Sequence, residues 1–551
     1  MRLSGSSLSH STLLKTLTKT ALASTIAALL AAPSWAADVP AGVTLADNQT
    51  IVRGNGDEVP TLDPSMSSDT SSSRVISDMF EGLVSEDLEG NIVPALATDW
   101  DIEQDGKQYT FHLRDAKWSN GTPITAHDFV FALQRVVNPA TGAPYSWYLE
   151  MASIVNADAI TRGEKTPDTL GVKALDDHTL QITLSKSVPY FIKMLAHEST
   201  FAVPETVVTQ YGDNWTKPEN IVTSGAYTLE TWTVNERVVL KRNPAYWNDA
   251  KTVINQVTYL PIQDGNAEYN RFRTGEIDIT STVPLEMYKN IKQSTPEVLL
   301  TMPSLGTYYY LFNTEKKPFD DPRVRKALAY ALDRDVVVNG ILGMGQLPAY
   351  TNTPPAVAGF DVPTLAWAEM TQAERNEKAK QLLAEAGYDQ DHPLSFELVY
   401  NTSEAHKKLA VAMASMWQKT LGVKVKITNQ EWKTFLQEMA SKNFEVARYA
   451  WMGDYNEAST FLSYFDSAGM NYGGWNNADY DEALKQALHA PEESQRLAFY
   501  QKAEEIFAEH MPAIPLYFYT TSVLKQPYIG GYSTTNASDR RYTRDLYVIK
   551  H

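Results

Sequence analysis

The chain has 551 residues, 43% hydrophobic and 21% charged, which is typical of a folded protein with about three or four domains. Lys and Arg total 48 against 66 Asp and Glu, giving a net charge of −18. This acidic balance does not fit the basic stripes that bind nucleic acid or the polybasic segments that dock on anionic membranes. The chain has no cysteine, which excludes disulfides, Cys-ligated zinc, iron–sulfur clusters and thiol nucleophiles.

The first 36 residues have the pattern of a secretory signal. Three basic residues are their only charged side chains, an apolar run covers residues 21–32, and Ser34 and Ala36 fit the small-residue rule for cleavage. The apolar run is too short for a membrane span, which needs about 20 residues. We therefore expect cleavage after Ala36, no stable insertion in the membrane and, in a cell with two membranes, a periplasmic location.

Strands and helices are mixed along the rest of the chain, which indicates an α/β or α+β class. In chain order, the periodicity of apolar residues predicts a strand over 108–113, a helix over 127–137, strands over 179–184 and 237–242, and helices over 323–333 and 371–386. The last helix has the clearest signals at its ends, with Thr371 as N-cap and Gly387 just after the final turn.

Common signatures of enzymes and cofactor sites are missing from the sequence. It contains no phosphate-binding loop, dinucleotide fingerprint, nucleophile elbow or His-Glu-x-x-His zinc helix, and its histidines are scattered. We therefore expect no catalytic residues, no cofactor and no metal. A glycosidase with two carboxylates is an enzyme alternative that sequence alone does not reject.

Aromatic residues are frequent, with 29 Tyr, 18 Phe and 12 Trp. Many of them gather in the segments 145–148, 307–310, 449–451 and 517–519. We expect most of these side chains in the core. The alternative for some is an amphipathic binding surface, because Tyr and Trp contribute a large and rigid contact area.

An ordered series of motifs gives the chain its resemblance to a known family. The motifs include Tyr109-Thr-Phe-His-Leu-Arg-Asp-Ala-Lys-Trp-Ser-Asn-Gly121, Asn243-Pro-Ala-Tyr-Trp247, Asp321-Pro-Arg-Val-Arg-Lys-Ala-Leu328 and Trp451-Met-Gly-Asp-Tyr-Asn-Glu457. Through essentially the whole chain after the signal, the sequence resembles the periplasmic oligopeptide-binding proteins. These are the solute-binding subunits of ABC peptide importers, and a close sister in the family binds a murein tripeptide.

The resemblance implies an α/β fold with two lobes that close around a hinge, as in a Venus flytrap, and an extra inserted domain. Mapped onto this sequence, lobe I comprises 37–80, 205–305 and 522–551, the inserted domain II comprises 81–204, and lobe III comprises 306–521. It also implies short peptides and the membrane permease of an ABC importer as partners, without nucleic acid. We expect a monomer that is not an enzyme.

The resemblance also implies a set of ligand-binding residues. Asp454 matches the aspartate that binds the ammonium group of a peptide, and Arg448 matches an arginine that binds its carboxylate. Further matching pocket positions are Trp432, Trp451, Tyr145, Tyr309 and His406. The segment 444–451 is extended in pattern and is a candidate to pair with a peptide backbone as an added strand.

Two departures from the family pattern bear on the ligand. Leu342 and Met439 stand where the oligopeptide binders have further basic residues, and Gly306 and Met452 stand at the positions of the family disulfide. The six-residue spacing of Arg448 and Asp454 would put both side chains on one face of an extended segment, with room for a tripeptide or tetrapeptide.

Other ligands are alternatives within the same family. They are a murein tripeptide, a nickel chelate and haem, and Asp454 favours a ligand with an α-amino group over the last two. The alternative from another class is a secreted hydrolase, which turnover of a peptide would reveal.

Overall fold

The structure is a computed structural model that describes residues 39–103, 105–490 and 492–551. The signal sequence expected over residues 1–36 lies outside the described residues. Within the described ranges, none of the helices combines the length and the hydropathy that a membrane span requires.

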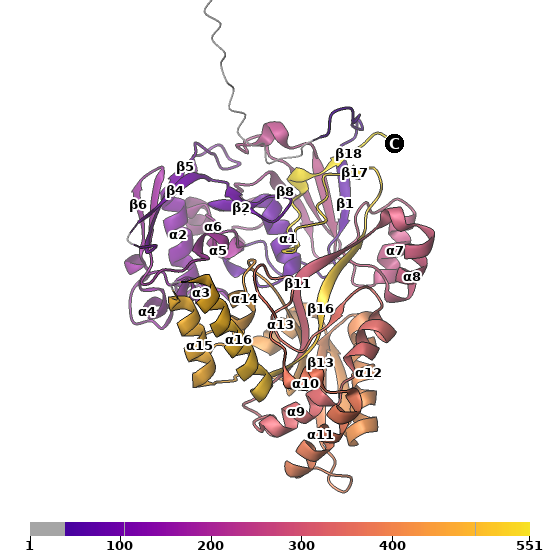
Figure 1. Cartoon of the computed structure of the whole chain (residues 1–551). Helices are drawn as coiled ribbons and strands as arrows, with labels where there is room; N and C mark the ends of the chain where they lie inside the picture. The colour runs from indigo at the N-terminus through magenta and orange to yellow at the C-terminus, as the bar shows by residue number, and fades with distance from the viewer. Residues whose placement is uncertain (1–38, 104, 491) are drawn as a thin grey trace, which may run out of the picture. The chain divides into compact units, whose positions relative to one another are not determined.

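Helices and strands alternate along the chain and confirm the expected α/β class (Figure 1). A four-stranded sheet has the order β1-β10-β9-β8, formed by Thr50–Gly54, Gln256–Leu260, Arg237–Arg242 and Tyr227–Thr233. Its β1 and β10 are parallel and the other pairs are antiparallel. β1 is thereby joined to a strand more than 200 residues further along the chain, since Thr50 pairs with Gln256.

A second four-stranded sheet is antiparallel throughout. Its order is β4-β5-β7-β6, formed by Ala97–Glu103, Gln108–Leu113, Thr179–Thr183 and Val172–Asp176. Alternate residues of β5 are buried, as the period-two pattern predicts. Helix α2 (Ala126–Val137) contacts this sheet and begins with a capping box of Thr125 and Asp128.

The largest sheet has six strands in the order β12-β16-β11-β15-β13-β14. They are Leu347–Pro348, Ala513–Leu524, Leu299–Phe312, Val446–Met452, Ser395–Asn401 and Lys424–Gln430. Two further strand pairs are β2 (Val84–Glu86) with β3 (Ile92–Pro94), and β17 (Ile529–Gly530) with β18 (Tyr547–Val548).

Helices pack beside these sheets (Figure 1). The longer ones are α1 (Thr70–Met79), α7 (Gly265–Arg273), α8 (Leu285–Ser294), α9 (Pro322–Tyr330), α11 (Gln372–Glu385), α12 (Glu404–Leu421), α13 (Trp432–Ala440), α15 (Ala478–His489) and α16 (Glu493–His510). Shorter ones are α3 (Ser146–Met151), α4 (Ala157–Thr161), α5 (Phe191–Met194), α6 (Glu205–Tyr211), α10 (Ala366–Glu369) and α14 (Ser459–Leu462). The strands and helices predicted from periodicity are confirmed, with ends that differ by a few residues.

Strand β11 separates two hydrophobic clusters of the largest sheet. Tyr309 and Leu311 belong to one cluster, whereas Tyr308 and Tyr310 belong to the other. Successive side chains of a strand point to opposite faces, so this alternation follows from the backbone. The three tyrosines have no exposed surface, which confirms a core position for this aromatic segment.

The two longest strands, β11 and β16, pair with an irregular register near the cavity described below. Pro303 pairs with Thr520 and the next paired residue, Thr307, pairs with Phe518. Both strands cross a boundary between the expected lobes I and III, which is where a hinge is predicted. The three larger sheets fall one in each expected domain, and the division into lobes stays a prediction.

Candidate ligand-binding site

A cavity of about 820 Å³ is lined by segments from all three expected domains. The lining includes residues of α1 and the loop before it, Tyr145, His197 and Glu198, and the segments 281–286, 401–408, 448–454, 519–522 and 538–542. Leu342, at the end of a π-helix over Val336–Leu342, also lines it. Met439 is fully buried in α13 and is not among the described lining residues.

Six of the seven residues predicted for the site line this cavity. They are Asp454, Arg448, Trp432, Trp451, Tyr145 and His406. Tyr309 is not among the described lining residues, because its position on β11 turns its side chain into the core. Its ring lies 5.9 Å from the ring of Tyr449, which does line the cavity, so Tyr309 supports the wall from behind.

Strand β15 offers a free edge to the cavity. Its first edge pairs with β11 along its whole length, from Val446 opposite Phe312 to Met452 opposite Gly306. Its second edge pairs with β13 only at Val446 and Ala447. Residues 449–452 line the cavity and, among the described strands, have no partner on this second edge. Such an edge can add an extended chain as a further strand, because its backbone donors and acceptors are available.

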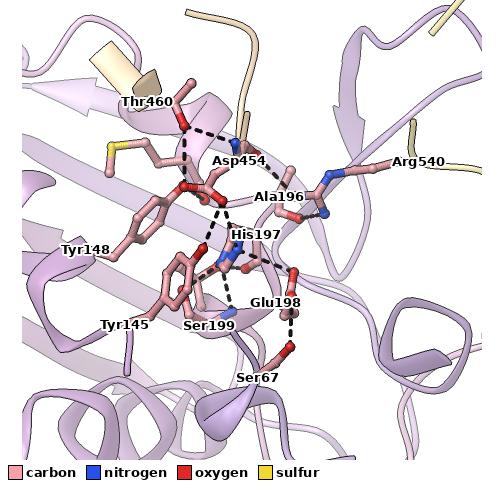
Figure 2. A network of polar contacts seen from close by, with 12 residues as sticks. Ser67, Tyr145, Tyr148, Ala196, His197, Glu198, Ser199, Asp454, Thr460 and Arg540 are labelled. Carbon is pink, nitrogen blue, oxygen red and sulfur yellow. Dashed lines mark hydrogen bonds and ion pairs between the residues drawn. The ribbon is translucent and has the colours of Figure 1, made fainter. Parts of the chain in front are cut away.

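Asp454 lies two residues beyond the end of β15 and is 7% exposed. Its Oδ1 accepts a hydrogen bond from the hydroxyl of Tyr145 at 3.2 Å, and its Oδ2 accepts one from Thr460 at 3.3 Å (Figure 2). Burial raises the pKa of Asp454 to about 7, and the negative charge of Glu198 acts in the same direction. The carboxylate is therefore costly to ionise unless a cation joins it.

Arg448 lies within β15, with Asn401 and Tyr519 as partners. Its two terminal nitrogens donate to Asn401 Oδ1 at 3.1 Å and to the hydroxyl of Tyr519 at 2.7 Å. Its guanidinium carbon lies 4.7 Å from the ring centroid of Tyr308. Its Nε is buried and has no hydrogen-bond partner in the described part of the chain. An acceptor in the cavity would satisfy this donor and pair with the charge.

The N-terminus of α12 adds to the positive character around Arg448. Residues 401–408, which include the first turn of this 18-residue helix, line the cavity, and a helix N-terminus favours a negative ligand group. His406 belongs to this turn. Burial and the charge of Arg448 lower the pKa of His406 well below its usual value, so the imidazole is neutral at pH 7.

Arg448 and Asp454 do not share one face of a straight strand, which corrects the expectation from their spacing. β15 ends at Met452. Arg448 packs on Tyr308, from one hydrophobic cluster, and Asp454 bonds to Tyr145, from the other. The spacing along the sequence therefore does not measure the length of a ligand.

Sequence reasoning missed two residues of the site, His197 and Glu198. The ring of His197 stacks on Tyr145 with 4.6 Å between the centroids. Its Nε2 lies close to the carboxylates of both Asp454 and Glu198 (Figure 2). They are more than 250 positions from Asp454, and no local pattern signals their role. The site as a whole combines a negative region, a positive region and a free strand edge, which suits an extended zwitterion.

Comparison with known proteins gives the family of the chain. Residues 91–473 match the family model described as "Bacterial extracellular solute-binding proteins, family 5 Middle". The chain is 48% identical to the periplasmic oligopeptide-binding protein OppA of Escherichia coli K12, over 96% of this chain and 98% of OppA. It is 45% identical to the periplasmic murein peptide-binding protein MppA of the same organism, over 94% of this chain and 96% of MppA. The chain belongs to family 5 of the bacterial extracellular solute-binding proteins.

Solved structures show the same fold. A structure of the murein tripeptide-binding protein MppA of E. coli matches with a TM-score of 0.91 and 44% identity, covering 92% of this chain and 100% of that chain. OppA of Haemophilus influenzae in complex with RPPGFSPFR matches with a TM-score of 0.89 and 41% identity, covering 92% of this chain and 100% of that chain. The unliganded open form of MppA matches with a TM-score of only 0.67 at 44% identity, covering 93% of this chain and 99% of that chain. The present structure is thus closer to the first MppA structure than to the open form.

Proposed function

We propose that the protein is the periplasmic solute-binding subunit of an ABC importer and that it captures short peptides by their backbone and termini. One observation carries this proposal. The cavity wall holds the carboxylate of Asp454 and the guanidinium of Arg448 at the two ends of the segment 448–454, and the free edge of β15 lies between them. Groups that every peptide shares can be met here without reading its sequence.

Each of the six predicted residues that line the cavity has a role in this proposal. Asp454 binds the ammonium group, and Arg448 binds the carboxylate with help from the positive end of α12. Residues 449–452 pair with the peptide backbone. Trp432, Trp451, Tyr145 and His406 shape the spaces for peptide side chains, where water fills unused room.

The relatives support this proposal through what they bind. One matching structure is an OppA in complex with a nine-residue peptide, and several matched relatives are named for oligopeptides. We infer that the signal is removed near Ala36, that the mature protein acts as a monomer in the periplasm, and that its two lobes close around the peptide before delivery to a permease.

A murein tripeptide is the second candidate ligand. The observation in its favour is the TM-score of 0.91 with the murein tripeptide-binding protein. Leu342 in the lining also removes a charge that the resemblance leads one to expect in a general peptide binder. Both candidates require the ammonium site, so they differ only in the rest of the ligand.

The experiment that tests the proposal is mass spectrometry of molecules released when the purified protein is denatured, followed by calorimetry with synthetic peptides. We expect bound peptides of mixed sequence, or a murein tripeptide if the second candidate holds. Absence of peptides, together with no binding of a tripeptide and tetrapeptide library, would overturn the proposal. Steady hydrolysis of the peptides would instead identify a hydrolase.

A further inference from the structure

The tautomer of His197 follows from its hydrogen bonds. The backbone N–H of Ser199 donates to Nδ1 of His197 at 3.2 Å, and the Ser199 hydroxyl lies 2.9 Å from the same atom. A backbone N–H can only donate, so Nδ1 carries a lone pair and the ring hydrogen is on Nε2. Burial lowers the pKa of His197 to about 4, which agrees with a neutral ring that has a single N–H group.

The single N–H of His197 lies between two carboxylates (Figure 2). Its Nε2 is 3.4 Å from Oδ1 of Asp454 and 3.6 Å from Oε2 of Glu198. Glu198 is 3% exposed. Its Oε1 accepts a hydrogen bond from Ser67 at 3.2 Å, whereas its Oε2 is buried without a hydrogen-bond partner among the described residues. One hydrogen therefore serves two buried acids.

Of the other groups around this pair, the tyrosines are uncharged, and Arg540 is a cation whose charge partly offsets the effect of burial on the pKa of both acids. Tyr145 and Tyr148 face Asp454, and burial raises the pKa of both phenols far above neutral pH, so they are uncharged. Arg540 donates to the carbonyl oxygen of Asp454 at 3.1 Å, and its charge is shared with Glu86 at 3.4 Å. Two ionised carboxylates without a further cation would be unfavourable in such a dry site.

We propose that His197 and Glu198 are positioning residues of the ammonium site: Glu198 places a second negative charge behind Asp454, His197 couples the two, and a bound ammonium group takes the place of a proton. This inference rests on the proposed function, since it concerns the amino end of a peptide. In the empty site Asp454 holds a proton, because burial and the charge of Glu198 raise its pKa. Glu198 stays ionised, because the effect of burial is outweighed by His197 and Arg540, which lower its pKa. A peptide ammonium then supplies the positive charge in place of this proton, which leaves Asp454 for solvent, so the net charge of the site is unchanged.

The proposal predicts a pH dependence with two limbs. Below about pH 7, the value to which the pKa of Asp454 is raised, the empty site holds a proton that the peptide must displace, so affinity increases as the pH rises. Above pH 8 the peptide amine itself loses its proton, because the pKa of an α-amino group is about 8. Affinity should therefore be highest between about pH 7 and 8.

The first test measures protons released on binding. Calorimetry of trialanine with the wild-type protein is carried out at pH 6 and pH 8, each in two buffers of different ionisation enthalpy. We expect release of close to one proton per peptide at pH 6. At pH 8 we expect a net uptake of about half a proton, because about half of the peptide amine is neutral there and binds as ammonium. Binding without proton release at pH 6 would overturn this inference and leave the proposed function intact. Failure of trialanine to bind at either pH would count against both.

The second test uses variants that separate coupling from folding. Glu198→Gln should release less than half as many protons at pH 6 and bind trialanine about tenfold more weakly at pH 8. His197→Phe keeps the ring on Tyr145 but removes the N–H, which should raise the pKa of the acids, so that proton release persists to higher pH than in the wild type. His197→Gln restores a donor and should recover part of the coupling. If any of these three variants does not fold, as its melting curve would show, the wild-type proton count decides in its place.

A matched control is Glu504→Gln. Glu504 is also a fully buried acid whose pKa burial raises to about 7, but it binds the backbone amides of Asn352 and Thr353 away from the described cavity lining. Its substitution should leave the proton count of peptide binding unchanged. Equal proton release at pH 6 in the wild type and in Glu198→Gln, together with an unshifted pH dependence in His197→Phe, would show that Asp454 acts alone and would overturn the proposal.

Discussion

Gly306 and Met452 lie directly opposite each other where β11 pairs with β15. A Cβ atom at position 306 would lie 2.6 Å from Sδ of Met452, so the long Met452 side chain occupies the space that the missing Gly306 side chain leaves. These are the two positions that the resemblance assigns to the family disulfide. In this chain, van der Waals packing stands where the resemblance implies a covalent link.

The first prediction restores that link. Gly306→Cys combined with Met452→Cys should form a disulfide on oxidation, since opposite residues of antiparallel strands have Cα atoms about 4.5–5.5 Å apart. The closed loop exceeds 100 residues, so unfolding should cost about 4–5 kcal/mol more. Denaturant unfolding with and without reductant measures this gain. Gly306→Ala is the control and should be destabilised by contact with Met452. Two titratable thiols after oxidation would contradict the prediction.

The second prediction concerns Asp454. Asp454→Ala leaves the peptide ammonium buried and unpaired, which should cost roughly 3–5 kcal/mol of binding free energy, or more than a hundredfold in Kd. Calorimetry of the wild type and the variant with a tripeptide and its N-acetylated form measures the effect. The acetylated peptide should bind the wild type poorly, and its Kd should differ far less between the wild type and Asp454→Ala. Equal affinity of the wild type for both peptides would refute the assignment.

The third prediction concerns Arg448. Amidating the C-terminus of the preferred peptide removes the charge that Arg448 would pair with, and we expect a loss of about 1–3 kcal/mol in binding. Arg448→Ala should bind acid and amide with nearly equal affinity, because the group that distinguishes them is gone. Arg323→Ala is a matched control, since its guanidinium pairs with Asp321 on an exposed surface. No amide penalty in the wild type would place the peptide carboxylate elsewhere.

The fourth prediction concerns stability against pH. Burial raises the pKa of Glu504 from 4.5 to about 7, so between these values the folded state holds a proton that the unfolded state has lost. The contribution is fully present below pH 4.5 and is lost as the pH rises to about 7, by up to about 3 kcal/mol. Glu504→Gln cannot ionise, so its melting temperature should fall less than that of the wild type between pH 5 and pH 8. Parallel curves would contradict this.

The fifth prediction concerns closure. Lys408 on α12 pairs with Glu286 on α8 at 2.8 Å, across the expected boundary between lobes III and I. Small-angle scattering should give a smaller radius of gyration with peptide than without it. Lys408→Glu should favour the open form without peptide by a small amount, as expected for an exposed pair. Lys407→Glu, whose partner Glu404 lies on the same helix, is the control. An unchanged profile at saturating peptide would argue against a hinge.

Much of the fold and part of the site could be predicted because local patterns carry them. The alternation in β5, the capping box of α11 at Thr371 and the extended segment of β15 are all visible in the sequence. Asp454 and Arg448 could be selected because they lie in motifs that resemble a family.

The remaining features depend on tertiary contacts. Three successive tyrosines at 308–310 do not reveal which of them faces Arg448, because the phase of a strand is set by what packs on each side. Tyr308 takes that place and Tyr309 does not. His197 and Glu198 reach Asp454 only through the folded arrangement of distant segments, and the bend after Met452 breaks the straight spacing on which a ligand length was based.

The irregular stretch of β11 has a consequence for the order in which a peptide is captured. Leu305, within that stretch, donates its N–H to Ala537 and accepts a hydrogen bond from the N–H of Gly453, the residue before Asp454. The ammonium site is thus tied to the pivot of the expected hinge, where a rotation displaces atoms least. In an open cleft, this end would stay assembled while the distant walls move apart. A peptide would then bind by its amino end first and pair with the free edge of β15 as the lobes close.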